Sequence, residues 1–120
     1  MSEELYRQAL DVAHRAYAPY SNFLVGAAVR TRDGRVFAGV NVENAAYPLG
    51  VCAERSALVQ AVGAGFRPGD IAAIGITASP CGGCRQWLHE FRIDSVTYMR
   101  DNGELVTVTP ADLLPDGFVM

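Results

Sequence analysis

Apolar and polar residues recur along the chain with two different periods, and each period predicts a type of element. Near the N-terminus, the apolar residues of one helical face are Leu5, Ala9, Val12 and Ala16. With Ser2 as its N-cap, this pattern predicts a helix over residues 2–16.

Further apolar runs, separated by turns rich in Gly, Pro, Asn and Asp, predict the other elements. We expect helices over residues 52–64 and 81–91, and a short helical turn over 110–114. Strands are expected over residues 25–31, 35–43, 71–78, 96–99 and 105–108, with an Asp-Gly hairpin turn joining the first two. The run over 71–78 is almost continuously apolar, as in a strand that is covered on both faces. This order of elements predicts an α/β fold in which one mixed sheet carries helices on its faces.

Length and charge narrow the class of protein. A chain of 120 residues suits one domain, which we expect to span residues 1–120. The net charge of -3 argues against a nucleic-acid partner, because such proteins normally present a basic face. No apolar stretch approaches the roughly 20 residues of a membrane helix, so no membrane partner is expected. The acidic N-terminus has no apolar run behind it, which favours a cytoplasmic protein without a signal peptide.

Residue types exclude some chemistry and favour a metal site. All ten basic residues are Arg, which excludes a Schiff-base lysine and a P-loop lysine. Cys81 and Cys84 are three residues apart at the start of a predicted helix, so both thiols can converge on one ion. A redox pair, two unrelated core cysteines, or half of a structural zinc site would have the same spacing. Cys52, which opens another predicted helix, favours a metal site with three thiolates.

The number of ligands separates a structural from a catalytic metal site. A structural zinc ion normally has four protein ligands, and neither His14 nor His89 has suitable spacing to be the fourth. Three protein ligands leave one coordination position open, as in catalytic zinc sites. The sequence therefore favours a catalytic Zn²⁺ over a structural one.

Two charged residues lie two and three positions after Cys52. Glu54 is expected to carry protons at the metal site, although a glutamate at a helix start is also often merely solvated. Arg55 is expected to hydrogen-bond the thiolates and to offset their negative charge, the alternative again being a solvated helix residue. Arg85, next to Cys84, is a weaker candidate for the same role.

The spacing of these residues resembles a known signature. Cys52-Ala53-Glu54 followed by Pro80-Cys81-Gly82-Gly83-Cys84 is similar to the zinc deaminase motif, Cys or His-x-Glu followed by Pro-Cys-x-x-Cys. Outside the motif, the chain resembles the small homotetrameric cytidine deaminases in residues 19–23, 25–28, 41–47, 79–86 and 113–118. The resemblance implies a three-layer α/β/α sandwich with a five-stranded mixed sheet, one Zn²⁺ per subunit and a homotetramer.

The same resemblance implies a substrate pocket. Asn41 and Glu43 would bind the ribose hydroxyls, and Phe23 would lie against the pyrimidine ring. The backbone of Ala53 and the carbonyl of Ser79 would bind the edge of the base. Without the family, Asn41 and Glu43 could equally be solvated residues at a strand end, and Phe23 would be assigned to the core.

Two further residues are implied to act across a subunit boundary. Tyr47 and Phe118 look like the family residues that reach the site of a neighbouring subunit. Taken alone, Phe118 would be an ordinary residue of a frayed tail.

The function implied is hydrolytic deamination of cytidine and 2′-deoxycytidine to uridine and 2′-deoxyuridine, a step of pyrimidine salvage. Glu54 would move protons between water, the ring N3 and the departing ammonia. Three alternatives stay open: a blasticidin-type aminonucleoside deaminase, an enzyme that edits RNA or DNA, and a non-catalytic zinc-stabilised interaction domain. The acidic charge disfavours the editing enzyme, and the interaction domain leaves Glu54 without a role.

Overall fold

The computed structural model describes residues 2–120, and only the backbone of Ser2. The predicted capping by the Ser2 side chain therefore lies outside the described residues. The elements, in chain order, are α1 (Ser2–Ala13), β1 (Gly26–Thr31), β2 (Val36–Val40), the 3₁₀ turn η1 (Tyr47–Leu49), α2 (Ala53–Gly63), β3 (Ile71–Ile76), α3 (Gly82–Glu90), β4 (Ser95–Met99), β5 (Leu105–Val108) and α4 (Pro110–Leu113). None of the helices in residues 2–120 has the length and apolar character needed to cross a bilayer.

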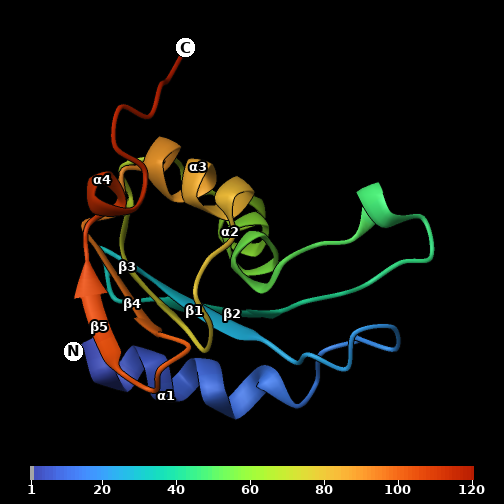
Figure 1. The fold of residues 1–120 in the computed structure, drawn as a ribbon. Helices are drawn as coiled ribbons and strands as arrows, with labels where there is room; N and C mark the ends of the chain where they lie inside the picture. Colours follow the sequence, from blue (N-terminus) through green and yellow to red (C-terminus); the bar gives the residue numbers. More distant parts are fainter. Residues whose placement is uncertain (1) are drawn as a thin grey trace.

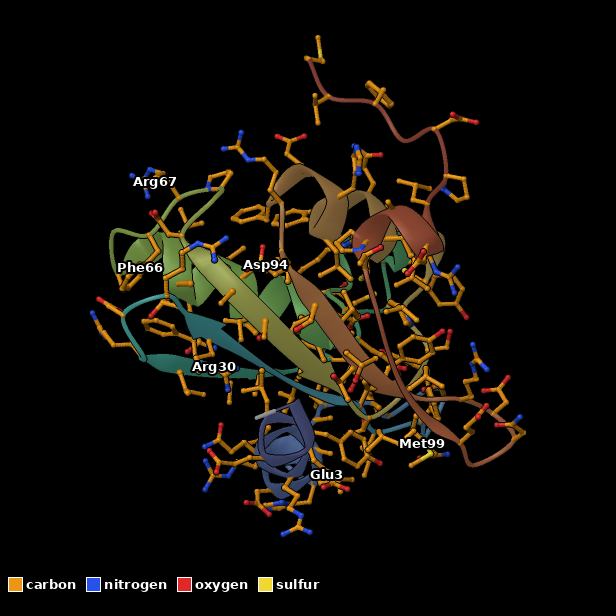
Figure 2. The ribbon with its side chains drawn as sticks, turned by 90° about the vertical axis from the view of Figure 1, so that its left-hand side faces the viewer. Glu3, Arg30, Phe66, Arg67, Asp94 and Met99 are labelled. Atoms are coloured by element: carbon orange, nitrogen blue, oxygen red, sulfur yellow. The ribbon has the colours of Figure 1, made fainter. Side chains whose placement is uncertain are left out.

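The five strands form one mixed sheet in the order β2-β1-β3-β4-β5. The pair β3–β4 is parallel, and the other neighbouring pairs are antiparallel. Helix α1 covers one face, while α2 and α3 cover the other (Figures 1 and 2). The predicted three-layer α/β/α sandwich with a five-stranded mixed sheet is confirmed.

Apolar residues fill both spaces between the layers. Leu5 and Ala9 of α1 pack against Ala28 and Ala73 of the sheet. A larger cluster on the other face joins helices α2 and α3 to the sheet. It includes Leu58, Leu88, Ile74, Ile76 and Val96. In β3, five of the six residues are buried, as predicted for a strand with both faces covered.

Two boundaries differ from the prediction for one reason. The first helix ends at Ala13 rather than Ala16, and the second strand ends at Val40 rather than Glu43. Tyr17 leaves the helix to pair with the segment after β2: its N–H donates to the Asn41 carbonyl at 3.0 Å, and its carbonyl accepts from the Glu43 N–H at 2.8 Å. The other predicted boundaries lie within two residues of those observed.

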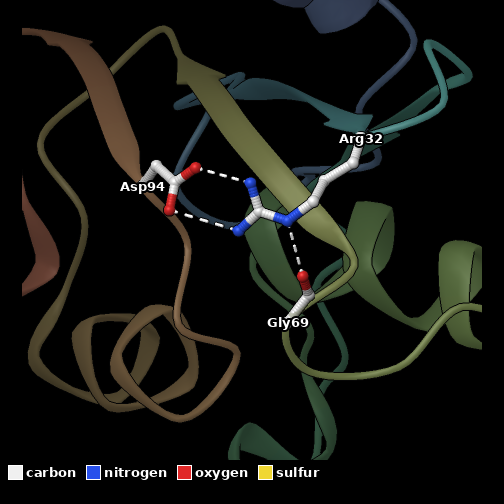
Figure 3. A network of polar contacts seen from close by, with 3 residues as sticks. All are labelled: Arg32, Gly69 and Asp94. Atoms are coloured by element: carbon white, nitrogen blue, oxygen red, sulfur yellow. Dashed lines mark hydrogen bonds and ion pairs between the residues drawn. The ribbon is translucent and has the colours of Figure 1, made fainter.

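An exposed arginine fastens the starts of the two parallel strands to the β1–β2 turn (Figure 3). Arg32 Nη1 lies 2.7 Å from Asp94 Oδ2, and its Nε donates to the Gly69 carbonyl at 2.7 Å. The Arg32 and Asp94 side chains are 49% and 61% exposed. Because solvent screens an exposed ion pair, this pair supports the loops rather than the core.

Helix α2 can approach β2 closely because Gly39 has no side chain. A Cβ at Gly39 would lie 2.4 Å from the backbone nitrogen of Ala57 and 2.8 Å from the Ala53 carbonyl oxygen, both in α2. These contacts are with backbone, so a side chain there would displace the helix itself. Gly39 thereby sets the position of the helix whose first turn carries Glu54.

Gly39→Ala is therefore expected to destabilise the protein by about 1–3 kcal/mol, the usual cost of overpacking. The expected fall in Tm is on the order of 4–8 °C per kcal/mol for a chain of this size, measured by thermal unfolding. Gly63→Ala is the matched control, because a Cβ at Gly63 of α2 meets nothing within 4 Å. Equal Tm values for the two variants would contradict the close approach at Gly39.

Candidate active site

Three cysteines from two helix starts form a cluster of sulfur atoms. The Sγ atoms of Cys52, Cys81 and Cys84 all lie within 4.8 Å of one another, and those of Cys52 and Cys81 are 3.8 Å apart. No disulfide joins them. The convergence expected from the sequence is confirmed.

The helix starts explain why the thiols converge. Cys52 is the N-cap of α2, and Cys81 is the N-cap of α3. The Cys81 Sγ accepts a hydrogen bond from the Cys84 N–H at 3.4 Å, as expected of a side chain that caps its own helix. The N-terminal end of a helix carries partial positive charge, so both helix starts present positive charge to the sulfur cluster.

The donor set and its spacing fit zinc. Tetrahedral Zn–S bonds of about 2.3 Å place two sulfurs about 3.8 Å apart. The Cys52–Cys81 distance of 3.8 Å equals this value, and Cys84 lies close enough to be the third ligand. Among residues 2–120, the three cysteines form the one cluster of Cys, His, Asp and Glu that could hold a metal ion. His14 and His89 are outside it, as expected.

The pKa values of Cys52 and Cys84 shift in opposite directions. A hydrogen bond from Cys84 lowers the pKa of Cys52 to about 6, and the charge of Arg55 adds to this effect. The pKa of Cys84 is raised, because its thiol is hydrogen-bonded to Cys52 and is buried. Of these two thiols, Cys52 is the one that ionises more readily and offers a thiolate to a metal.

Glu54 lies beside this cluster in the first turn of α2. Its side chain is almost fully buried, with 4% of the residue exposed. Burial, with a smaller contribution from the charge of Cys52, raises the pKa of Glu54 to about 7. A carboxyl group with such a pKa can both accept and donate a proton near neutral pH, which is what a general acid–base requires.

Arg55 lies near the sulfurs and against α3. A Cβ at Gly83 would lie 2.3 Å from Arg55 Nη2, so the missing side chain leaves the space that the guanidinium occupies. Burial lowers the pKa of Arg55, but the charges of Cys84 and Cys52 outweigh burial and raise the pKa overall. Arg55 Nε is buried without a hydrogen-bond partner among residues 2–120. The position is that of a cation facing the three sulfurs.

Arg85 does not take the role considered for it. Its Nε donates to the Pro80 carbonyl at 2.9 Å, Nη1 to the Leu113 carbonyl at 3.2 Å, and Nη2 to Ser79 Oγ at 3.2 Å. The guanidinium thus binds the turn before α3 and the end of α4 instead of the thiols. Arg85 fastens the turn that carries the Ser79 carbonyl.

A cavity of about 180 Å³ is lined by Cys52, Cys81 and Glu54. Most of the predicted pocket residues line it: Phe23, Asn41, Ala53 and Ser79. Phe23 is 61% exposed, so its ring is free to cover a planar ligand. Val25 and Ala78 also line the cavity and were not predicted, because one begins and the other closes a predicted strand of apolar residues, which is typical of the core.

Glu43 lies outside this cavity. It lines a neighbouring hollow of about 330 Å³, together with Tyr20, Ser21 and Tyr47. The predicted pair Asn41 and Glu43 is thus divided between two adjoining spaces.

The two residues expected to act across a subunit boundary are exposed. Tyr47 in η1 is 83% exposed, and Phe118 in the C-terminal tail is 67% exposed. Phe118 is held through its backbone carbonyl, which accepts from Gln86 Nε2 at 2.9 Å. Neither aromatic side chain belongs to the core cluster of its own chain.

Known proteins share this sequence and architecture. Residues 1–100 match the family model described as the cytidine and deoxycytidylate deaminase zinc-binding region. A cytidine deaminase of Halalkalibacterium halodurans is 41% identical over 122 residues, covering 95% of this chain and 91% of the relative. A probable cytidine deaminase of Dictyostelium discoideum is 36% identical over 98% of this chain and 86% of its own length.

Solved structures agree with the sequence comparison. The 1.6 Å crystal structure of cytidine deaminase from Burkholderia pseudomallei has a TM-score of 0.91 at 45% identity, covering 98% of this chain and 99% of that one. Cytidine deaminase from Mycobacterium tuberculosis has a TM-score of 0.83 at 35% identity, covering 98% and 97% of the two chains.

Proposed function

Because this chain belongs to the family of zinc-binding cytidine and deoxycytidylate deaminases, we propose that it deaminates free cytidine and 2′-deoxycytidine by hydrolysis. In this reaction water adds to C4 of the base, the C4–N bond breaks and ammonia leaves, so that uridine or 2′-deoxyuridine is formed. Residues 1–120 act as one catalytic domain. The observation that carries the proposal is a buried glutamate beside three thiols at one small cavity.

Cys52, Cys81 and Cys84 hold the zinc ion, one per chain. A zinc ion with an open coordination position supplies a Lewis acid that makes hydroxide available near neutral pH. Three thiolates oppose this effect by their negative charge. The guanidinium of Arg55 and the two helix N-termini counter that charge, which supports a catalytic site.

Glu54 moves the protons. It takes a proton from water and delivers it to N3 of the pyrimidine, and it later passes a second proton to the departing amino group. Its burial and its pKa of about 7 suit both directions of transfer.

The other cavity residues bind the nucleoside. The exposed Phe23 ring covers the base, while the Ala53 backbone and the Ser79 carbonyl bind its polar edge. Asn41 and Glu43 bind the sugar hydroxyls, one from each of the two adjoining spaces. These roles follow from the family resemblance and from the position of each residue at the cavity.

A substrate panel tests the proposal. Ammonia release is measured with cytidine, 2′-deoxycytidine, cytosine, deoxycytidine monophosphate and blasticidin S, together with the zinc content of the protein. We expect one zinc per chain and turnover of the two nucleosides well above the other three compounds. Preference for the monophosphate would reassign the substrate to nucleotides, and preference for blasticidin S would support that alternative instead.

We also propose that four chains assemble. Four apolar residues of the segment after β2 are exposed: Val42, Tyr47, Leu49 and Val51. Figure 1 shows this segment, with η1, extending away from the sheet. Apolar patches of this kind mark protein interfaces, and Tyr47 and Phe118 are placed where they can reach a neighbouring chain. Light scattering should give four times the 12.9 kDa of one chain, and a single-chain mass at assay concentration would contradict the tetramer.

A role in pyrimidine salvage in the cytoplasm is the cellular part of the proposal. All three cysteines are needed as thiolates for the metal, and reduced thiols persist in the cytoplasm. The reaction converts a free cytosine nucleoside to a uracil nucleoside, which is a recycling step. Growth of a pyrimidine-requiring host on cytidine, with the gene present or deleted, tests this role.

A further inference from the structure

The segment between α1 and β1 carries Phe23. Two side chains from the segment after β2 hold this part of the chain in place. Asn41 Oδ1 accepts from the Val25 N–H at 2.8 Å, and Asn41 Nδ2 donates to the Phe23 carbonyl at 2.9 Å. Glu43 Oε1 accepts from the backbone N–H groups of Tyr20 and Ser21 at 3.0 and 3.2 Å. The segment has no regular structure of its own, so these bonds set the position of the Phe23 ring.

Ser21 joins the two parts of this network. Its Oγ is hydrogen-bonded to Glu43 Oε2, and the same Oγ accepts from the Phe23 N–H at 3.0 Å. The hydrogen bond from Ser21, together with those from the backbone, holds the pKa of Glu43 below its ordinary value. Since an ionised carboxylate only accepts hydrogen bonds, the Ser21 hydroxyl must donate to Glu43. One hydroxyl thus aligns Glu43 and Phe23 together.

The same bonds limit what Glu43 can still bind. A carboxylate offers about four acceptor positions. Ser21 Oγ and the N–H groups of Tyr20 and Ser21 fill three of them. About one position is left, so Glu43 can accept a hydrogen bond from one ligand hydroxyl in a fixed direction.

The two spaces at this network match the two halves of a nucleoside. The cavity at the cysteines, about 180 Å³, is smaller than the roughly 300 Å³ at the lower end of ordinary ligand sites. Phe23 and Asn41 line this cavity, while Ser21 and Glu43, each two residues away in the sequence, line the hollow of about 330 Å³. A base in the cavity would therefore place its sugar on the side of the hollow, where Ser21 and Glu43 lie.

We propose that Ser21 is a positioning residue that aligns the Glu43 carboxylate with the Phe23 ring, so that the pocket favours nucleosides with sugar hydroxyls over those without. The proposal rests on the proposed function, because it assumes a cytosine nucleoside as substrate. It adds a residue to the site that acts only through Glu43 and Phe23.

The test compares cytidine with 2′,3′-dideoxycytidine, which has the same base but lacks both ring hydroxyls. In Ser21→Ala, kcat/KM for cytidine should fall about tenfold, mainly through KM, since a hydrogen bond to a charged group is lost. The value for dideoxycytidine should fall clearly less, because this substrate feels only the loss of Phe23 alignment and has no ring hydroxyl for Glu43 to bind. Ser21→Thr retains the hydroxyl and should restore the wild-type ratio.

A double-mutant cycle with Glu43→Gln separates this role from a general structural one. If Ser21 acts through Glu43, the double variant should lose no more selectivity than Glu43→Gln alone. Equal losses for both substrates, additive losses in the cycle, or failure of Ser21→Thr to restore the ratio would overturn the proposal. Wild-type protein that turns over neither nucleoside would instead overturn the proposed function, and the Ser21 role with it.

Discussion

Glu54→Gln is expected to lower kcat for cytidine by about 10⁴-fold while the protein keeps its zinc. The substitution preserves the shape of a side chain that is almost fully buried, but the amide cannot take up or release protons at neutral pH. General acid–base catalysis is typically worth about 10²–10⁴-fold, and Glu54 is proposed to serve in two transfers. Steady-state ammonia release gives kcat, and atomic absorption gives the zinc content.

The matched control is Glu3→Gln. Glu3 is an exposed glutamate in the first turn of α1, on the opposite face of the sheet from α2 and α3. Its substitution makes the same chemical change and should leave kcat at the wild-type value. Activity of Glu54→Gln within tenfold of wild type would show that another group transfers the protons.

The second large effect concerns the metal. Cys84→Ala is expected to reduce zinc from one ion per chain to nearly none, and to reduce turnover to background. Cys84 is fully buried, and its sulfur completes the one cluster of potential metal ligands found among residues 2–120. Zinc content measured after gel filtration separates this variant from Glu54→Gln, which is inactive with its metal in place.

Zinc should also stabilise the wild type against unfolding, but not Cys84→Ala. A ligand that binds only the folded state stabilises it by about 4 kcal/mol at a thousand times its Kd. Adding a chelator should therefore lower the Tm of the wild type and leave that of Cys84→Ala unchanged.

Cys52→His is the conservative counterpart to Cys84→Ala. The deaminase signature accepts histidine or cysteine at the position of Cys52, so this variant should retain zinc and measurable turnover. Full zinc content in Cys84→Ala, or its complete loss in Cys52→His, would contradict the proposed ligand set.

Much of the architecture was predictable because its signals are local. The apolar run of β3, the helical spacing around Leu5 and Ala9, and the Asp-Gly turn after β1 each lie within a few residues of chain. Their order then predicted the mixed sheet and its layers. The ends of α1 and β2 were not predictable in this way. Each depends on the pairing of Tyr17 with residues 41 and 43, which are distant in sequence.

The candidate site was likewise predictable only where its signals are local in sequence. The spacing of Cys81 and Cys84 indicated a shared ion, and the added Cys52-Ala53-Glu54 indicated a deaminase-like centre. Nothing in the sequence pattern indicated that Ser21 binds both Glu43 and Phe23, or that Arg85 binds carbonyls instead of thiols. These contacts join segments that only the folded sheet and its helices bring together.

The sequence by itself therefore determined the type of fold, the three metal-binding thiols and the glutamate beside them, because spacing within a helix or motif sets which side chains share a face. Only the tertiary structure decided how these groups are surrounded. The approach of α2 to Gly39, the space at Gly83 that Arg55 occupies and the burial that raises the pKa of Glu54 all arise from packing between elements. Packing distances, burial and the division of the pocket into two spaces depend on contacts between distant residues, and a local pattern does not contain them.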